Sequence, residues 1–239
     1  TRADSLEPPM GDPGGGSDFA GFYNHFGIPM ADWGFGGPSG IYHSAYDTFA
    51  WMERFGDPGF QYHATAARIG AAMLLRLANA QVLPYDYVEF ARTMTRYLAP
   101  VERGLTQKGW SAAAVAPLAA AISRLEKSAT DFATTRDAAL STAITPAALL
   151  AANSALLRVE RALARPSGLK SRPWYRSLIY ASDVDNGYST MSFPGINEAI
   201  RYGTQPETVA EINDLAARFG AAADAVDAAR AALSAFAPR

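Results

Sequence analysis

Hydrophobic residues recur at three- and four-residue intervals through most of the chain after residue 85, which is the period of an amphipathic helix. Four stretches show this period: residues 85–105, a segment from about residue 117, a segment from residue 145, and a last one from residue 204. Their apolar stripes are Tyr87, Phe90, Met94, Tyr97 and Val101; Leu118, Ile122, Leu125, Ala129 and Phe132; Leu149, Leu150, Leu156, Leu157 and Leu163; and Ile212, Leu215, Phe219, Ala222, Val226, Ala229, Leu233 and Phe236. The pattern predicts a helical bundle.

The starts of two of these helices can be read from the sequence. Thr145 followed by Pro146 is a capping residue followed by a residue suited to the first helical turn. Thr204 and Glu207 have the spacing of a capping box. The stripe after them alternates strictly in threes and fours, as in left-handed helix packing. Because this stripe is longer than one neighbouring helix needs, we expect it to form the contact surface of a homodimer.

The stretch before residue 85 has a different composition, with most of the glycines, seven of the fifteen prolines and all three histidines. We predict a short helix at 17–27, capped by Ser17 or Asp18 and stopped by glycine, and helical turns at 47–56. Residues 28–35 read as a strand, which Pro29 restricts to an edge. Residues 57–80 are apolar on most faces, which predicts a buried helix.

Residues 165–205 interrupt the helical pattern with aromatic residues, prolines and glycines. Loops of this length inside a compact domain are usually functional or well packed. We therefore expect this segment to carry function or to pack closely on the bundle.

Composition and charge exclude several classes of protein. With 49% hydrophobic and 18% charged residues the chain is typical of a globular protein. The net charge is −2 without a long basic run, which argues against a nucleic acid or an anionic membrane surface as partner. No apolar run reaches membrane-spanning length. The absence of cysteine excludes disulfides and thiolate metal sites. The N-terminus lacks methionine and a signal pattern, so we expect a sequence cut from something longer, or processed.

The chemistry that these residues offer by themselves is limited. A two-zinc hydrolase needs about five oxygen or nitrogen ligands, and three histidines without clustered carboxylates do not provide them. His25 and His63 fall in predicted helices, where a packed or exposed histidine is the ordinary case. Glu53 and Asp57 are unspecific as acids. The residues alone indicate a partial α/β domain followed by a helical bundle, with His43 in a glycine-preceded loop as an open question.

Six runs of the sequence change this interpretation. They are GSDFAGFYNHFGIP, YHSAYDT, DPGFQYH, RLANAQVLPYDY, RPWYRSLIYA and SFPGI. In this order and spacing the chain resembles the C-terminal third of the glutamate carboxypeptidase II family of zinc peptidases, whose relatives include the transferrin receptor. The resemblance implies a mostly α chain, in which residues 1–85 end an α/β zinc-peptidase domain. Residues 86–239 would be a transferrin receptor-like helical dimerisation domain.

The resemblance also implies roles for individual residues. His43 would be the last protein ligand of a two-zinc centre, and Tyr42 would donate a hydrogen bond to the oxyanion of the transition state. Ser17, Gly187 and Tyr188 would line the substrate pocket. The remaining zinc ligands and the glutamate that acts as general base would lie upstream of residue 1. The intact protein would then be a homodimeric zinc exopeptidase of carboxypeptidase type acting on peptides, and this chain alone would be inactive.

Two departures from the family bear on specificity. Members that cleave C-terminal glutamate have a lysine-tyrosine pair before the SFPG run, and here Gly187 stands at the lysine position beside Tyr188. Those members also carry an arginine patch where residues 31–40 read ADWGFGGPSG. We therefore expect a weaker preference for glutamate, while peptidase chemistry is unaffected.

Two alternatives to the active peptidase are open. The intact protein could be a non-catalytic, receptor-like dimeric binding protein, or the chain could be an isolated dimerisation module. Retention of Tyr42 and His43 favours the enzyme, since a protein without catalysis has no need of them. The compartment is open, and the resemblance allows an exported protein.

Overall fold

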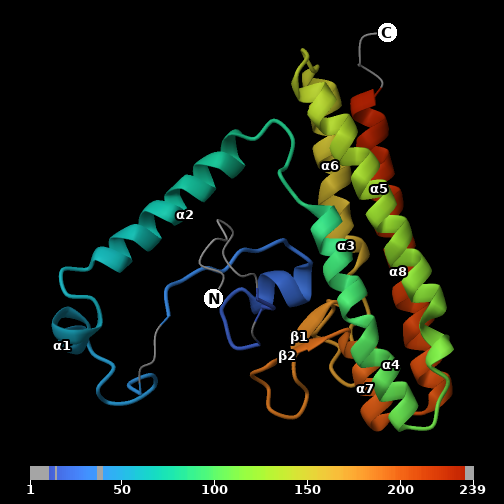
Figure 1. Ribbon diagram of the computed structural model, residues 1–239, viewed down its shortest axis with the longest axis horizontal. Coiled ribbons are helices and arrows are strands. Elements are labelled where there is room, and N and C mark those ends of the chain that lie inside the picture. Colours follow the sequence, from blue (N-terminus) through green and yellow to red (C-terminus); the bar gives the residue numbers. More distant parts are fainter. Residues whose placement is uncertain (1–10, 14, 37–39, 235–239) are drawn as a thin grey trace. The chain divides into compact units, whose positions relative to one another are not determined.

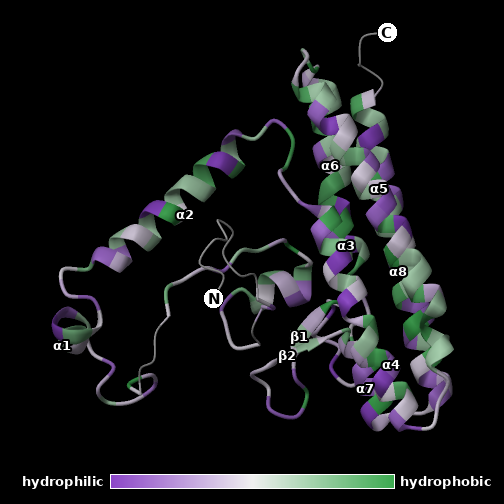
Figure 2. Cartoon of the chain, viewed as in Figure 1, coloured by the Kyte–Doolittle hydropathy of each residue, from purple (hydrophilic) through white to green (hydrophobic). Residues whose placement is uncertain are grey.

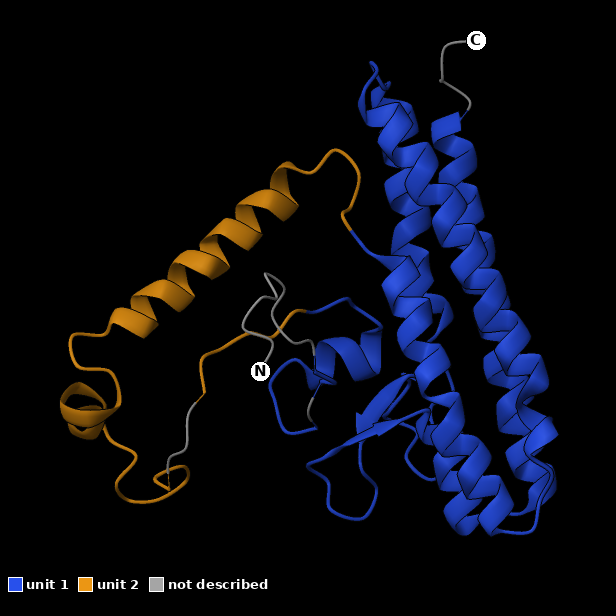
Figure 3. Ribbon diagram, in the orientation of Figure 1, with its two compact units in different colours: residues 1–30, 85–239 blue, residues 31–84 orange. Residues whose placement is uncertain are grey.

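The computed structural model describes residues 11–13, 15–36 and 40–234. It is mostly helical, as predicted, with one small two-stranded sheet (Figure 1). The chain divides into two compact units (Figure 3): unit 1 combines residues up to 30 with those from 85 onwards, and unit 2 comprises residues 31–84. The domain boundary that we place after residue 85 stays a prediction.

Unit 1 contains the helical bundle. Its helices are α3 (Tyr87–Arg96), α4 (Leu98–Gln107), α5 (Ala116–Leu140), α6 (Pro146–Ala162), α7 (Pro194–Tyr202) and α8 (Gln205–Ser234), with a 3₁₀ turn at Ala112–Val115. Helix α8 is central, since α5, α6 and α7 all pack against it, and α3 packs on α5. Figure 1 shows α5, α6 and α8 running alongside one another. The predicted bundle is confirmed.

Both helix starts read from the sequence are present. The Thr145 hydroxyl accepts the N–H of Ala148 at 3.3 Å and begins α6. At the start of α8 the Thr204 N–H donates to the Glu207 carboxylate at 2.9 Å, and the Glu207 N–H approaches the Thr204 hydroxyl at 3.5 Å. These bonds satisfy N–H groups that the helix itself leaves unpaired.

The apolar stripe of α8 is internal. All its described members, from Ile212 to Leu233, are buried, while Phe236 lies outside the described residues. Ala216, Ala223 and Ala225, which lie off the stripe, are buried as well. Because α5 and α6 pack against α8, the described part of this stripe, from Ile212 to Leu233, is not accessible to a partner. The expectation that it forms a dimer surface is therefore wrong.

The predicted helix at 85–105 is two helices. It breaks at Tyr97, whose N–H bonds to the carbonyl of Met94 at 3.1 Å. Pro100 explains the break, because proline cannot donate to the carbonyl four residues earlier and its ring clashes with it. The chain resumes as α4 directly afterwards, and Leu98, Val101 and Leu105 face the core.

Helix α6 buries three alanines but only some of its leucines. Ala148, Ala152 and Ala155 are at most 2% exposed, whereas Leu150 is 71% and Leu157 38% exposed. Alanine lets α6 approach α8 closely, so the leucines beside these alanines turn outwards. The predicted apolar side of α6 is wrong at these two leucines, which lie two helical turns apart on the outer face.

The segment at 165–205 is well packed. It forms β1 (Tyr180–Ser182) and β2 (Thr190–Ser192), an antiparallel pair in which Ala181 lies opposite Met191, and then α7. A short π-helical turn, Gly21–His25, packs beside it, and its Asn24 carbonyl accepts N–H groups of Arg176 and Ser177. The predicted helix at 17–27 thus exists in shortened form, ended at Gly27 with φ +64°. Its start has no side-chain cap, so the predicted Ser17 or Asp18 cap is wrong.

Glu160, in the last turn of α6, lies within electrostatic range of four tyrosines. They are Tyr23 of the π-helical turn, Tyr85 and Tyr87 at the start of α3, and Tyr180 of β1. Glu160 is partly buried, and this burial raises the pKa of its carboxyl to about 7. A negative charge near a helix C-terminus is also unfavourable. The fold therefore favours the neutral form of Glu160.

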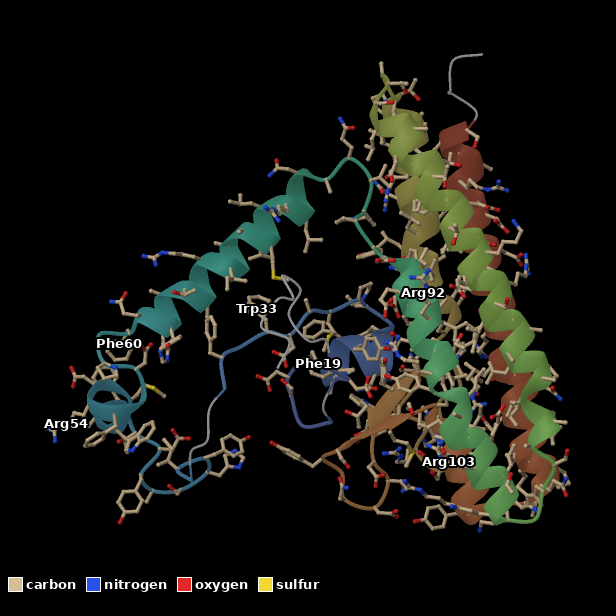
Figure 4. The ribbon with its side chains drawn as sticks, viewed as in Figure 1. Phe19, Trp33, Arg54, Phe60, Arg92 and Arg103 are labelled. Atoms are coloured by element: carbon tan, nitrogen blue, oxygen red, sulfur yellow. The ribbon has the colours of Figure 1, made fainter. Side chains whose placement is uncertain are left out.

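Unit 2 contains α1 (Phe49–Trp51), which continues into a π-helical turn (Met52–Gly56), and α2 (Gln61–Asn79). The Thr48 hydroxyl caps α1 by accepting the N–H of Trp51 at 3.2 Å. The predicted strand at 28–35 is wrong: these residues pair with no strand in the described chain. Instead Trp33 lies against α2, where its indole donates to the carbonyl of Ala66 at 3.3 Å (Figure 4).

Helix α2 forms as predicted, but it is not buried. Leu74 and Leu75 are 66% and 64% exposed, and Gly70, under the Trp33 ring, is its one buried residue in the described chain. Figure 2 shows hydrophobic residues on α2 with hydrophilic residues between them and at its ends. In the described part of unit 2, other contacts with α2, such as the Phe35 ring on Tyr62, leave the helix residues they touch exposed. The expectation that residues 57–80 form a buried helix is therefore wrong in the structure of this chain.

Candidate functional site

Tyr42 and His43 lie in a tight loop of unit 2. The N–H of Ser44 bonds to the Ile41 carbonyl at 2.9 Å, and the Ser44 hydroxyl accepts the N–H of Tyr46 at 3.2 Å. These bonds turn the chain sharply just before α1. Tyr42 is 65% exposed, and His43 is also exposed.

His43 has an unusual backbone conformation. Its φ is +58°, in the left-handed region that residues other than glycine rarely adopt. The imidazole stacks on the Tyr42 ring, with centroids 3.8 Å apart and planes 21° apart. Such strain persists where neighbouring structure maintains it and is concentrated at binding and active sites. The loop therefore holds an adjacent hydroxyl and imidazole in a fixed, exposed arrangement.

The described residues do not make a metal site by themselves. None of them forms a group of three or more His, Asp or Glu side chains that could hold a metal ion. Zinc in hydrolases takes at least three protein ligands, and here His43 offers one imidazole nitrogen. The described chain alone thus does not fit a zinc centre, although an exposed imidazole is a suitable single ligand.

A second histidine of unit 2 has a clear structural role. The Asp57 carboxylate accepts N–H groups of Tyr62 and His63 at 3.2 and 2.9 Å, and its Oδ2 lies 2.7 Å from His63 Nδ1. Burial acts to raise the pKa of Asp57, but these hydrogen bonds outweigh it and lower the pKa. The pair anchors the first turn of α2. Sequence reasoning missed the contact, and the spacing of six residues was its only local signal.

Unit 1 contains the three positions expected in the substrate pocket. The N–H of Gly15 bonds to the Tyr188 carbonyl at 2.8 Å, and a Cβ on Gly15 would lie 2.8 Å from both that carbonyl oxygen and the Cα of Ser182. Glycine is therefore required for this close approach. Ser17 follows directly and is exposed. The glycine run thus brings the Ser17 segment beside Tyr188, although the two are far apart in sequence.

Gly187 precedes Tyr188 at the tip of the loop between β1 and β2. It has φ +68°, and no atom lies within 4 Å of where its Cβ would be. The structure therefore groups Ser17, Gly187 and Tyr188 in unit 1, whereas Tyr42 and His43 belong to unit 2. Asp183, Asn186 and Arg201, which brace this loop, were not identified from the sequence.

No helix in the described residues has the length and hydropathy to cross a membrane. Residues 113–227 match the transferrin receptor-like dimerisation domain, which includes α5, α6, α7 and most of α8. This match agrees with the observed helical bundle.

Relatives extend the similarity beyond this domain. A probable glutamate carboxypeptidase of Arabidopsis thaliana, LAMP1, is 37% identical over 187 residues, or 78% of this chain and 26% of the relative. The mouse (Mus musculus) aminopeptidase NAALADL1 is 28% identical over 81% of the chain and 27% of its own length. A Schizosaccharomyces pombe protein named an inactive zinc metalloprotease is 26% identical over 84% of the chain and 27% of its own length.

The chain thus spans about a quarter of the length of these relatives. The dimerisation-domain match lies in unit 1, and the alignments to the peptidases cover most of the chain. The chain therefore belongs to the transferrin receptor-like and glutamate carboxypeptidase family.

Proposed function

We propose that this chain is the C-terminal part of a zinc-dependent exopeptidase of carboxypeptidase type. His43 would supply one zinc ligand, and Tyr42 would donate a hydrogen bond to the oxyanion that forms on the peptide carbonyl. Ser17, Gly187 and Tyr188 would line the pocket for the substrate. The observation that carries the proposal is the strained, exposed Tyr42-His43 pair, because strain of this kind is concentrated at binding and active sites.

The exposed apolar faces of α2 support the same proposal. A helix that is hydrophobic on most faces is usually a core helix. Further segments of a peptidase domain would cover Leu74 and Leu75 and could bring the other zinc ligands to His43. Peptidases among the relatives, named as carboxypeptidases and aminopeptidases, agree with this assignment.

A non-catalytic dimeric binding protein is the second candidate. The relative named an inactive zinc metalloprotease shows that loss of activity occurs among similar proteins. The glycine at residue 187 would suit a pocket that no longer binds a C-terminal glutamate. The two candidates differ in whether the full-length protein turns over peptides.

We expect the isolated chain to bind zinc weakly and to hydrolyse no peptide, whereas the full-length protein should retain zinc and hydrolyse peptides. One imidazole does not retain a hydrolytic zinc ion, and the general base is expected elsewhere. The measurement is zinc content after dialysis, together with turnover of dipeptides ending in Glu, Leu or Ala. Stoichiometric zinc and turnover by the chain alone would show that the site is misplaced. A zinc-loaded but inactive full-length protein would favour the binding protein.

We also propose that unit 1 forms a homodimer through the outer face of α6. The match to a dimerisation domain indicates self-association, and the α8 stripe is not accessible for it. Leu150 and Leu157 are the exposed leucines of α6, and they lie on the same side of the helix. A two-fold contact would cover this face in both protomers.

Replacing Leu150 and Leu157 together by Glu is expected to weaken dimerisation at least about tenfold, because charges would enter an apolar contact. Light scattering over a micromolar dilution series measures this change. The matched control, measured like the α6 variant on this chain alone, is the same double substitution at Leu74 and Leu75 of α2, which are exposed there and lie outside the bundle. An unchanged dimer in the α6 variant, with loss of dimer in the control, would place the interface in unit 2.

A further inference from the structure

The loop between β1 and β2 is ordered by its own side chains. The Asp183 N–H donates to the Ser189 carbonyl at 2.7 Å and closes the base of the loop. The Asp183 Oδ1 atom accepts N–H groups of Asp185 and Asn186 at 2.9 and 3.3 Å. A single carboxylate oxygen thus folds the first half of the loop, as in an Asx turn.

Asn186 folds the second half. Its Oδ1 atom accepts the N–H groups of Tyr188 and Ser189, both at 2.8 Å, and its Nδ2 donates to the Ser189 hydroxyl at 2.6 Å. The carbonyl of Tyr188 accepts a hydrogen bond from the Gly15 N–H at 2.8 Å. Both backbone groups of Tyr188 are therefore fixed without any ligand.

Arg201 of α7 connects the loop to the helical bundle. Its Nη1 donates to Asp183 Oδ2 at 3.0 Å and to Asp185 Oδ2 at 2.8 Å. The Tyr202 hydroxyl also donates to Asp185. The Asp183 side chain is only 11% exposed, so its ion pair with Arg201 is shielded from water on the carboxylate side. The two oxygens of Asp183 have separate partners, the loop backbone and the helix.

We propose that Arg201 and Asn186 are positioning residues, which hold Tyr188 in the conformation that binds the substrate. This inference rests on the proposed peptidase function. Neither side chain needs to touch the substrate. Asn186 accepts the N–H groups of Tyr188 and Ser189, and Arg201 binds the carboxylates of Asp183 and Asp185 that order the loop. A loop ordered in advance loses less conformational freedom on binding, so loosening it weakens substrate binding. We therefore expect the loss of either side chain to raise KM and to leave kcat nearly unchanged.

The test is a double-mutant cycle in the zinc-loaded full-length protein, with Arg201→Met, Tyr188→Phe and the double variant. Arg201→Met is expected to raise KM for a Glu-terminated dipeptide about tenfold with kcat within about twofold. In the Tyr188→Phe background the same change should raise KM much less, because Arg201 acts through Tyr188. Arg103→Met, at an exposed position on α4 (Figure 4), is the matched control and should change neither constant.

Asn186→Ala provides a second variant that leaves the ion pair intact. It should also raise KM and should speed hydrogen exchange at the N–H groups of Tyr188 and Ser189. Unchanged KM in both variants of an active protein, or fully additive effects in the cycle, would overturn the positioning role alone. A wild-type protein without turnover would overturn the proposed function and this inference together.

Discussion

Replacing Glu160 by Gln is expected to raise the free energy of unfolding of unit 1 at pH 8 by up to about 3 kcal/mol. Below about pH 4.5 the same replacement should have little effect, since the carboxyl is then neutral in both the folded and the unfolded state. The side chain lies within electrostatic range of four tyrosines and near the C-terminal end of α6, where the helix dipole disfavours a negative charge.

The direction of this effect follows from proton binding. The pKa of Glu160 is about 7 in the folded protein, against an ordinary value of 4.5. Between these two values the folded state retains a proton that the unfolded state has released. Stability therefore falls as the pH rises through this window, and the loss is complete above about pH 7. Glutamine has no proton to lose, so the variant should lack this part of the pH dependence.

Hydrogen exchange of the most protected amides in α6 and α8 measures the stability of unit 1 at each pH. The matched control is Glu102→Gln, at an exposed position on α4, which should leave the pH dependence as it is in the wild type. Parallel curves for wild type and Glu160→Gln between pH 4.5 and 8 would contradict the prediction. They would mean that water or a cation reaches the carboxylate in solution.

The parts of the fold that sequence reasoning predicted depend on local signals. The start of α6 can be predicted from Thr145 and Pro146, and the start of α8 from Thr204 and Glu207. Each pair lies within four residues of sequence. The break at Tyr97 was equally local, because Pro100 removes a specific hydrogen bond. The apolar period of residues 85–105 does not reveal this break, because Pro100 interrupts the hydrogen bonding without interrupting the hydrophobic pattern.

The predictions for α6 and α2 were wrong about which residues each apolar face contacts in the folded protein. Periodicity identified Leu150 as apolar surface, but it does not show that alanines of α6 are the residues that face α8. The same limit applies to α2, whose sequence predicts burial without specifying a partner. At the candidate site the resemblance identified Tyr188. The contacts that hold it come from Gly15 and, through the loop, from Arg201, and no local pattern connects residues so distant in sequence.

In the full-length protein, Gly187→Lys is expected to increase the preference for a C-terminal Glu over Leu by about ten- to a hundredfold in kcat/KM. A lysine here would add a charge-assisted hydrogen bond to the substrate carboxylate, typically about 1.5–3 kcal/mol, at about 1.4 kcal/mol per tenfold. The space beside Gly187 is open, so the side chain fits. The φ of +68° disfavours any L-residue, by roughly 1–2 kcal/mol, which affects folding of the loop for all substrates alike.

Gly187→Ala is the matched control, because it has the same backbone strain without the charge. It should lower kcat/KM for Glu-, Leu- and Ala-terminated dipeptides by similar factors and leave their ratios unchanged. Dividing the Glu-over-Leu preference of Gly187→Lys by that of Gly187→Ala then gives the effect of the charge alone. If the wild type already prefers Glu strongly and lysine changes the ratio no more than alanine does, then residue 187 does not face the substrate. Another cation would in that case bind the terminal carboxylate, and the assignment of this loop to the substrate pocket would be wrong.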